Sequence, residues 1–434
     1  MNIQELYSCF TEADGIAIDT RNITPNSLFF ALKGDNFDAN EFAQEALDKG
    51  ARYVIMDNPK LVTDRDKMFL VPNALQALQQ LANYHRQQLG LPIIALTGSN
   101  GKTTTKELIK AVLSRKYNVK ATQGNYNNHI GVPLTLLQFD DETDIGIVEM
   151  GANHLNEIAL LCTIAQPDYG YITNFGKAHL EGFGGFEGVI KGKSELYDYL
   201  EDNHKMAFVN ADDPRQDAKT ITFSRYTFGS KETEANLEVE IIEHTELATI
   251  QLGEKRITSH LTGQYNATNM AAAVAIGQYF GVSLEEANQA IQAYIPTNNR
   301  SQWIKQEPFT ILLDAYNANP SSMELSVANF NQLPSTSPKI YILGDMFELG
   351  TASEKEHKNI IQQVEDTTFE KAFFIGKEFS KVKDTTTSTA ITFFETLPDF
   401  MAAYGDVAQI LAHHTVLIKG SRGMALEKII SFLK

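Results

Sequence analysis

Cysteine and tryptophan are scarce in this sequence, and the low cysteine count excludes two classes of protein. The 434 residues include one tryptophan and two cysteines, Cys9 and Cys162. The cysteines lie far apart, and neither belongs to a C-x-x-C or C-x-x-H pattern, so neither a disulfide framework nor a zinc site is expected. We expect both to be small buried side chains in a reducing compartment.

Positive charge and long apolar runs are also in short supply. The sequence has 37 Lys and Arg against 54 Asp and Glu, a formal net charge of −17. Binding to a nucleic-acid backbone needs clustered cations, so the composition argues against a nucleic-acid partner. There is no run of eighteen uninterrupted apolar residues, and the N-terminus has no basic region followed by an apolar one. We therefore expect a cytoplasmic protein without membrane insertion.

What the sequence does contain is an alternation of short apolar runs with helical segments, over a length that suits two or three domains. Uninterrupted apolar runs of this kind are typical of buried parallel strands, so we predict an α/β fold with helices on both sheet faces. Residues 234–262 alternate between polar and apolar and predict an antiparallel patch. Pattern breaks at 89–92 and 295–300 divide the chain into predicted domains of residues 1–89, 90–297 and 298–434. The predicted strands are residues 27–32, 53–56, 93–96, 145–149, 169–173, 206–209, 309–313, 339–343, 372–375 and 416–418.

The most informative segment is the glycine-rich turn GSNGKTT, which follows the apolar run 93–96 and precedes a helical segment. Backbone amides of such a turn converge on an anion at the positive end of the helix. Lys102 would reach the β- and γ-phosphates of a nucleotide, and the Thr103 hydroxyl would hold a magnesium ion. The full phosphate-loop pattern has a glycine where this sequence has Leu96, a departure of one residue. The residues expected to bind the nucleotide phosphates are Gly98, Ser99, Asn100, Gly101, Lys102, Thr103 and Thr104.

Three further polar residues follow predicted strands of the central domain. Ligands gather at the carboxyl ends of parallel strands, and Glu149, which closes the run 145–148, can meet a magnesium ion carried by phosphates on the neighbouring turn. His179 lies in a glycine-rich loop, and Lys193 lies near the start of a helical segment. Taken singly, Glu149 is favoured as a ligand over a solvated glutamate, whereas residues such as His179 and Lys193 are more often a surface histidine and an exposed lysine.

Together, several separated motifs resemble the Mur ligases, the ATP-dependent amide ligases of peptidoglycan precursor synthesis. The resemblance lies in residues 97–104, in 174–180, and in Asn266 and Asn269 before the alanine run 271–273. It covers essentially the whole chain, with the motifs in order. It implies a central ATP-binding domain with a parallel sheet, flanked by an N-terminal UDP-binding α/β domain and a C-terminal Rossmann-like domain.

The motifs at the two ends resemble particular members of the family. Residues 19–34 are similar to the UDP-binding domain of the members that form the tripeptide and the pentapeptide. Residues 314–320, 343–357 and 419–422 are similar to the member that joins D-alanyl-D-alanine to UDP-N-acetylmuramoyl-tripeptide. The resemblance therefore implies these two substrates, ATP and two magnesium ions, and a monomeric protein.

The resemblance also implies a mechanism. ATP phosphorylates the substrate carboxylate, and the amine of the dipeptide attacks the acyl phosphate; the activation is needed because a carboxylate is a poor electrophile. In this sequence Lys102 would stabilise the transferring phosphoryl group, Thr103 and Glu149 would hold one magnesium ion, and His179 would help to bind a second. Lys193 matches a family lysine that is carbamoylated in several members, and as a carbamate it would support a magnesium ion.

ATP would be contacted from both sides of the linker before the last domain. That arrangement implies closure of the C-terminal domain during turnover, with residues 296–299 as the hinge. The nucleotide contacts that the resemblance assigns are Asn269 for the adenine, Arg300 for the γ-phosphate region, Asp314 for the ribose, and Tyr316 and Asn317 beside the base.

The substrate contacts implied by the resemblance are spread over all three domains. Arg21 offers a charged fork that suits a diphosphate. The sequence departs from the family at Asn40, where a histidine is common. The expected substrate-binding residues are Thr20, Arg21, Asn127 and Asn128 for the UDP-linked peptide, and Asn319, Ser421 and Arg422 for the dipeptide.

Two alternatives compete with this interpretation. One is a related ligase, either the member that adds the third amino acid or a folylpolyglutamate synthase; the sequence after Asp314, AYNANP, differs from the DNPR run of the diaminopimelate-adding type. The other is a nucleotide-binding regulator without catalysis. A regulator has no physical reason to keep Lys102, Glu149, His179 and Lys193 together, and this argues against it.

Overall fold

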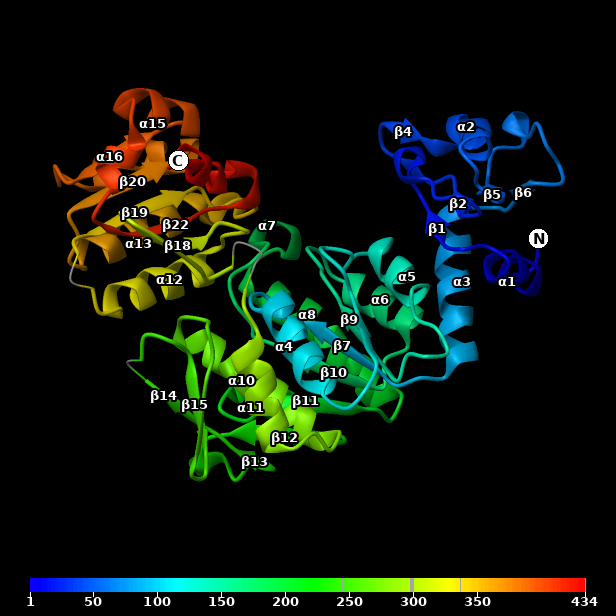
Figure 1. The fold of residues 1–434 in the computed structure, drawn as a ribbon, viewed down its shortest axis with the longest axis horizontal. Helices are drawn as coiled ribbons and strands as arrows, with labels where there is room; N and C mark the ends of the chain where they lie inside the picture. The colour runs from blue at the N-terminus through cyan, green and yellow to red at the C-terminus, as the bar shows by residue number, and fades with distance from the viewer. Residues whose placement is uncertain (244, 297–299, 336, 434) are drawn as a thin grey trace.

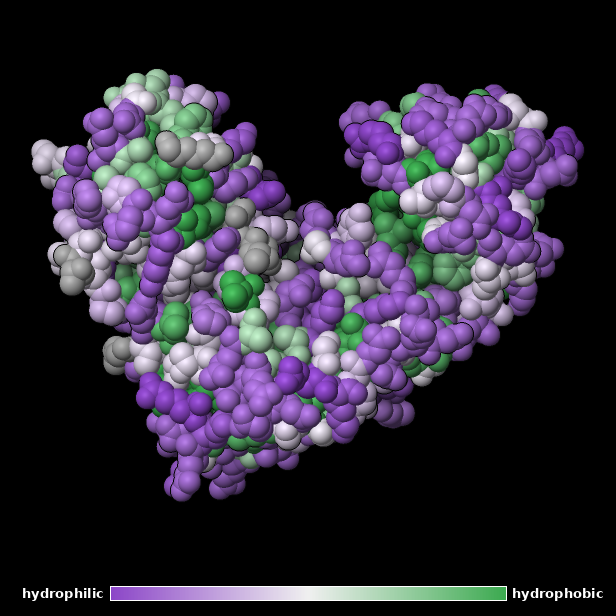
Figure 2. All heavy atoms as spheres, in the orientation of Figure 1, coloured by the Kyte–Doolittle hydropathy of each residue, from purple (hydrophilic) through white to green (hydrophobic). Residues whose placement is uncertain are grey.

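The chain folds into three α/β lobes arranged as an open V, with the central lobe at the vertex (Figure 1). The computed structural model describes residues 1–243, 245–296, 300–335 and 337–433. The predicted boundary between 297 and 298, and residues 297–299 of the expected hinge, lie outside the described residues. Figure 2 shows that the space between the two arms is open in this view and that its walls carry both hydrophilic and hydrophobic side chains.

The N-terminal lobe is joined to the central lobe by one long helix, α3 (Ala74–Leu89). Its first turn is capped by the Asn73 side chain, which accepts from the Gln76 amide at 2.8 Å. A single apolar cluster includes Phe30 of the N-terminal sheet, Leu78 of α3 and Ile158 of the central lobe, so these two lobes share a core. The four parallel strands of the N-terminal sheet are, in order, β1 (Ile16–Ala17), β2 (Leu28–Phe30), β5 (Tyr53–Met56) and β6 (Met68–Leu70).

The central lobe is built on a parallel sheet with helices on both faces, as predicted, but two of its seven strands, at residues 119–121 and 225–229, were not predicted. From β7 the chain crosses to β8 and β9 on one side and then to β10 on the other, so β7 marks the point where the strand order reverses. In sheet order the strands are β13 (Leu237–Glu238), β12 (Arg225–Gly229), β11 (Met206–Asn210), β10 (Tyr169–Ile172), β7 (Ile93–Thr97), β9 (Ile145–Glu149) and β8 (Val119–Ala121). The helices are α4 (Lys102–Leu113), α10 (Gln264–Tyr279) and α11 (Leu284–Ala293) on one face, and α5 (Gly131–Leu136), α6 (Glu157–Ala165) and α8 (Phe186–Asp202) on the other.

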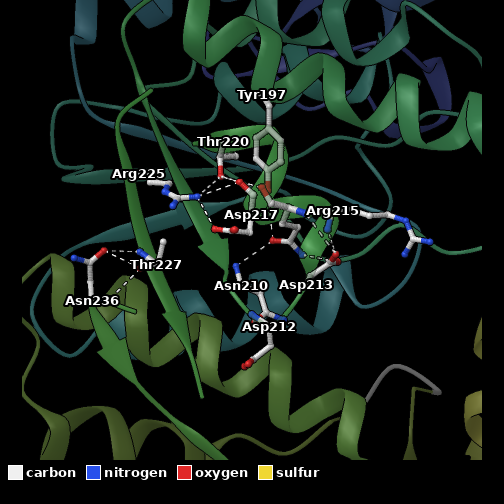
Figure 3. A network of polar contacts seen from close by, with 11 residues as sticks. Tyr197, Asn210, Asp212, Asp213, Arg215, Asp217, Thr220, Arg225, Thr227 and Asn236 are labelled. Carbon is white, nitrogen blue, oxygen red and sulfur yellow. Dashed lines mark hydrogen bonds and ion pairs between the residues drawn. The ribbon is translucent and has the colours of Figure 1, made fainter. Parts of the chain in front are cut away.

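The antiparallel patch predicted over 234–262 is correct only in part. Strands β14 (Glu240–Ile242), β15 (Thr249–Leu252) and β16 (Lys255–Thr258) do form an antiparallel sheet. Residues 237–238 instead pair parallel with β12, which makes the prediction wrong there. The reason is visible in Figure 3: the Asn236 amide oxygen accepts from both the backbone and the hydroxyl of Thr227, at 2.8 and 3.0 Å, and aligns the next residues with β12.

The outer half of the central sheet is fixed by a polar network beside the short helix α9 (Pro214–Thr220), shown in Figure 3. Asp213 caps this helix by accepting from the Arg215 amide at 2.9 Å, and Asp217 pairs with Arg225 at 2.7 Å. The acidic side chains here are therefore occupied as a helix cap and an ion pair.

The C-terminal lobe is a second Rossmann-like sheet, and its four predicted strands are confirmed. Two edge strands were not predicted: β17, which is antiparallel, and β21. In sheet order the strands are β17 (Gln302–Gln306), β18 (Phe309–Asp314), β22 (Thr415–Lys419), β19 (Lys339–Gly344), β20 (Lys371–Ile375) and β21 (Ile391–Phe394). Helices α12 (Pro320–Gln332) and α13 (Ser353–Glu365) cover one face, and α15 (Leu397–Tyr404) and α16 (Val407–Leu411) cover the other.

The C-terminal lobe is seated on the central lobe over the short helix α7 (Leu180–Phe183). Leu180 and Phe183 belong to the same apolar cluster as Met346 and Leu349 of the C-terminal lobe. Across the part of the chain that is described, no helix is both long and apolar enough to cross a membrane.

Asp168 offers a test of how α3 is tied to the central sheet. Its carboxylate accepts from Arg86 of α3 at 2.7 Å, from the Ile93 amide at 3.1 Å and from Lys205 at 2.7 Å. We expect Asp168→Ala to cost about 3 kcal/mol, because it leaves the mostly buried Arg86 guanidinium without its carboxylate. The exposed pair Glu354–Lys358 supplies the control: Glu354→Ala should cost less than about 0.5 kcal/mol. Equal shifts of the urea midpoint in the two variants would contradict this role of Asp168.

Candidate functional site

A cleft of about 560 Å³ lies between the central and C-terminal lobes. Its central wall is formed by the glycine-rich turn, the end of β9 and the start of α10. Its other wall is formed by the end of β18 and the start of α12. The predicted site residues that line it are Ser99, Asn100, Gly101, Lys102, Thr103, Thr104, Asn127, Asn128, Glu149, His179, Asn269, Arg300, Asp314, Tyr316, Asn317 and Asn319.

Two glycines give the turn after β7 its shape. Gly98 and Gly101 have φ values of +141° and +80°, in the region that side-chain-bearing residues rarely adopt. A Cβ at Gly98 would lie 2.0 Å from the Thr173 hydroxyl oxygen, and one at Gly101 would lie 2.9 Å from the Asn269 amide oxygen. The turn therefore packs directly against α10 and against the residue that follows β10, and residues 99–104 line the cleft.

Lys102 is the first residue of α4 and is half-buried, with its ammonium folded back over the turn. The Nζ donates to the Gly98 carbonyl at 2.7 Å. Burial lowers the pKa of Lys102, an effect that Glu149 opposes and Arg300 reinforces. A partly desolvated cation in this place would be stabilised by an anionic ligand, as the sequence predicts.

Glu149 and Thr103 meet where β9 ends beside the turn. The register that pairs Leu96 with Glu149 places the buried carboxylate next to α4. The Thr103 hydroxyl donates to its Oε2 at 3.0 Å, and Asn127 Nδ2 donates to Oε1 at 2.9 Å. A hydroxyl and a carboxylate are the oxygen donors that magnesium takes from protein when phosphates complete its shell. Within the described ranges no group of three or more His, Cys, Asp or Glu side chains is placed to hold a metal ion.

Sequence reasoning missed Lys106, one turn beyond Lys102 on α4. Its side chain is almost fully buried, with Nζ 2.5 Å from the Thr122 carbonyl and 3.9 Å from Glu149 Oε2. The spacing of four residues places both lysines on one side of the helix, and this was the available signal. Lys106 supports Glu149 from behind and holds the end of β8 beside it.

His179 is brought to the cleft from the loop that follows β10. It adopts a left-handed conformation, with φ +52°, immediately before α7. Its Nδ1 contacts a carboxylate oxygen of Glu348, which belongs to the C-terminal lobe. Burial lowers the pKa of His179, while the neighbouring Glu348 carboxylate acts in the opposite direction.

Lys193 lies just behind the cleft wall, in the middle of α8 and not near its start. It is 1% exposed, and its Nζ donates to the carbonyl of Ala152, a residue that lines the cleft. Its Nζ also lies 5.2 Å from the centroid of the Phe183 ring. Burial, reinforced by the charge of Lys102, holds the pKa of Lys193 well below its usual range. The amine is therefore neutral over a wider pH range than that of a surface lysine.

The C-terminal wall presents an arginine stacked on a tyrosine. The Arg300 guanidinium lies 3.7 Å from the centroid of the Tyr316 ring, and its Nε has no hydrogen-bond partner among the described residues. Asp314 accepts from Lys419 Nζ at 2.5 Å and from the Ser301 amide at 3.1 Å. The parallel register opposes Asp314 to Lys419, so this carboxylate is held in place by the sheet.

Four predicted substrate-binding residues are not among those that line the cleft. Thr20 and Arg21 lie in the N-terminal lobe, where the exposed Arg21 guanidinium is bound to Asp19 at 2.6 Å. Ser421 is buried, and its hydroxyl accepts from the Phe347 amide at 3.1 Å. Arg422 is exposed and lies 3.5 Å from Glu427.

Asn40, the departure from the family pattern, has a structural role. It is 1% exposed and its amide oxygen accepts from the Asp57 amide at 3.0 Å. Its Nδ2 donates to the carboxylates of Asp38 and Asp57, at 2.6 and 3.0 Å. These bonds hold the turn after β4 (Phe37–Asp38) against the end of β5.

Comparisons with known proteins agree with this architecture. Residues 12–86 match the Mur ligase family catalytic domain, residues 96–277 the Mur ligase middle domain, and residues 299–422 the Mur ligase glutamate ligase domain. The chain is 34% identical to the UDP-N-acetylmuramoyl-tripeptide–D-alanyl-D-alanine ligase of Bacillus subtilis strain 168, over 98% of this chain and 93% of that protein. The enzyme of the same name from Escherichia coli K12 is 33% identical, over 99% and 96%. The crystal structure of MurF from Acinetobacter baumannii superposes with a TM-score of 0.87 and 29% identity, covering 100% of this chain and 98% of that one.

The buried amine of Lys193 predicts an unusual stability profile. Its pKa is lower in the folded protein than in the unfolded chain, so the unfolded chain binds more protons between the two values and stability rises with pH through that range. We expect Lys193→Met to stabilise the protein by about 1 kcal/mol at pH 6, since the desolvation cost disappears. The gain should be smaller at pH 9, and it should vanish above the unfolded pKa of about 10.4.

Urea denaturation at the two pH values measures this difference, with Lys191→Met, an exposed lysine of the same helix, as the control. A gain at Lys193 that is independent of pH, or that Lys191→Met reproduces, would contradict the assignment of a buried neutral amine.

Proposed function

The chain belongs to the Mur ligase family, and we propose that it joins D-alanyl-D-alanine to UDP-N-acetylmuramoyl-tripeptide at the expense of ATP. The products are the UDP-N-acetylmuramoyl-pentapeptide of peptidoglycan synthesis, ADP and phosphate. The observation that carries the proposal is the cleft between two lobes, which presents a phosphate-binding turn and a buried carboxylate on one wall.

The reaction needs the substrate carboxylate to be activated before an amide can form. A carboxylate oxygen attacks the γ-phosphorus of ATP and ADP leaves; the dipeptide amine then attacks the acyl carbon, and phosphate leaves from the tetrahedral intermediate. Lys102 lies over the turn and offsets charge on the transferring phosphoryl group. Asn127 holds Glu149 in place, so the positions of the charges are set before the substrates bind.

We assign the magnesium ligands to the oxygen donors on the central wall. Thr103 and Glu149 would hold one ion, which would offset the charge of the ATP phosphates when bound. His179 would help to hold a second magnesium ion. Carbamoylation of Lys193 would add an anionic group beside the second ion. In this step the neutral amine adds to carbon dioxide, an N–C bond forms, and one proton leaves the nitrogen. The lowered pKa of Lys193 favours this step, because only the neutral amine is nucleophilic.

We assign the nucleotide to a position that spans both walls. Asn269 would contact the adenine and Arg300 the γ-phosphate region, Asp314 would accept from the ribose hydroxyls, and Tyr316 and Asn317 would lie beside the base. The walls belong to different lobes, so nucleotide binding would favour their closure.

The UDP-linked peptide would extend from the cleft towards the N-terminal arm, with Asn127 and Asn128 near the reacting end and Thr20 and Arg21 near the diphosphate. We assign the dipeptide to Asn319, Ser421 and Arg422 on the C-terminal lobe. These roles correspond to domains of residues 1–89, 90–297 and 298–434 in a monomer. We propose a cytoplasmic location, because ATP and a UDP-linked precursor are the proposed substrates.

The choice of acceptor tests the proposal. With ATP, magnesium and UDP-N-acetylmuramoyl-tripeptide, we expect phosphate release that depends on D-alanyl-D-alanine and exceeds release with any single amino acid at least about 100-fold. Continuous phosphate detection measures this. Release with a single amino acid would assign the chain to the preceding ligation, and no release with any acceptor would support a regulator.

Among the site residues, Lys102 is the one whose side chain should matter most for turnover and least for stability. We expect Lys102→Ala to lower phosphate release about 100- to 1000-fold, since a preorganised charge on the transferring group is lost. The thermal midpoint should change little, because the ammonium makes one hydrogen bond, to Gly98. Lys110→Ala, two turns along the same helix, is the matched control. Equal turnover in the two variants would exclude the assigned role.

A further inference from the structure

His179, which lines the cleft, contacts Glu348 of the C-terminal lobe, and both residues are held in left-handed backbone conformations. His179 of the central lobe has φ +52° and Glu348 of the C-terminal lobe has φ +61°, and neither is a glycine. Such conformations persist only where the surroundings impose them, and they gather at functional sites. Here the two residues meet across the lobe boundary, through Nδ1 of the histidine and Oε2 of the glutamate.

The segment that carries Glu348 is held in place from both sides. The Met346 amide donates to Nε2 of the buried His357 at 3.1 Å, and the Phe347 amide donates to the Ser421 hydroxyl at 3.1 Å. Leu349 is packed in the apolar cluster that contains Leu180. The carboxylate is therefore presented by a rigid turn, although it is itself half exposed.

The segment that carries His179 is bound to the C-terminal lobe at every second residue. The Lys177 amide donates to the Ser321 hydroxyl at 2.9 Å, and its Nζ lies 3.0 Å from Glu356. Two residues after His179, the Glu181 amide donates to the Glu348 carbonyl at 3.2 Å. Seating of the C-terminal lobe therefore fixes the backbone on both sides of the histidine as well as its ring.

We propose that Glu348 is a positioning residue for His179, and that it couples the orientation of this histidine to docking of the C-terminal lobe. Its carboxylate accepts a hydrogen bond from the Nδ1–H group, which leaves Nε2 as the acceptor nitrogen of the ring. A carboxylate partner fixes the tautomer and the ring orientation of a histidine in this way. When the lobe moves away, His179 loses its partner and its orientation together.

A side-chain contact this exposed contributes little to stability, so its effect should appear in orientation and turnover. The role of the oriented His179 in turnover rests on the proposed function. The positioning itself is a property of the ligand-free protein and can be measured without turnover.

The first test is made on the ligand-free full-length protein labelled with ¹⁵N-histidine. The His179 signals are assigned by their loss in His179→Gln. In the wild type we expect a single tautomer with the proton on Nδ1, and in Glu348→Ala a mixture of both tautomers. Glu354→Ala, an exposed glutamate on α13 paired with Lys358, should leave the signals unchanged. An unchanged tautomer in Glu348→Ala would overturn the proposal.

The second test is the effect on turnover. We expect Glu348→Ala to lower kcat for phosphate release about 10- to 100-fold, with the KM for ATP changed less than about threefold. Glu348→Gln should recover most of the loss, since its amide oxygen can still accept from Nδ1. A kcat for Glu348→Ala within twofold of the wild type, or a glutamine variant as impaired as the alanine variant, would overturn the proposal. A wild type without phosphate release would instead refute the proposed function and leave the tautomer result to decide the positioning role.

Discussion

The contact between Thr103 and Glu149 is the interaction on which the whole cleft depends. It exists because β7 and β9 are parallel neighbours, so the turn after one strand and the carboxylate at the end of the other lie at the same sheet edge. β7 is also where the chain reverses its direction across the sheet, so the crossovers leave an open crevice at its carboxyl end. The cleft residues that come from the C-terminal lobe face this contact from the opposite wall.

The cleft carries positively charged side chains although the chain as a whole is strongly acidic. The protein carries a net charge of −17, but cations reach the cleft from two lobes, Lys102 from the central one and Arg300 from the C-terminal one. Burial lowers the pKa of Lys102, so the positive charge of this side chain is held in the cleft at a cost in solvation. Phosphate groups of a nucleotide would offset that cost. Ligand binding and closure of the two walls are therefore expected to favour each other.

Four strands of the central sheet and the glycine-rich turn were predictable from sequence because their signals are local, whereas the short strand β8 and strand β12 were missed. The apolar run before GSNGKTT and the glutamate that ends residues 145–149 are each complete within a few residues, and the predicted strands match β7 and β9. Edge strands β17 and β21 were missed because they are partly exposed and lack an uninterrupted apolar run. Residues 237–238 were misassigned because their pairing is decided by Asn236 and Thr227, a contact that alternation of polar and apolar residues does not encode.

The site residues also divide into those with a local sequence signal and those whose contacts are distant in sequence. Lys102 and Thr103 were predicted from one continuous motif, and the four-residue spacing from Lys102 was the local signal for Lys106. The contacts of Lys106 with Thr122 and of Glu348 with His179 join residues 16 and 169 positions apart, so no local pattern encodes them. Ser421 was predicted as a substrate contact from a motif, and the structure places its hydroxyl under the turn that carries Glu348. A motif locates a functional region, and the three-dimensional contacts show in addition which of its residues hold a neighbouring segment in place.

The central claim is that this cleft activates a carboxylate by phosphorylation, and isotope transfer tests it most directly. UDP-N-acetylmuramoyl-tripeptide labelled with ¹⁸O in the reacting carboxylate is converted in unlabelled water, and the released phosphate is analysed by mass spectrometry. The account predicts one ¹⁸O atom in each phosphate, because the oxygen that attacks ATP leaves with the phosphoryl group. Phosphate without label would contradict it, since ATP would then have been hydrolysed by water.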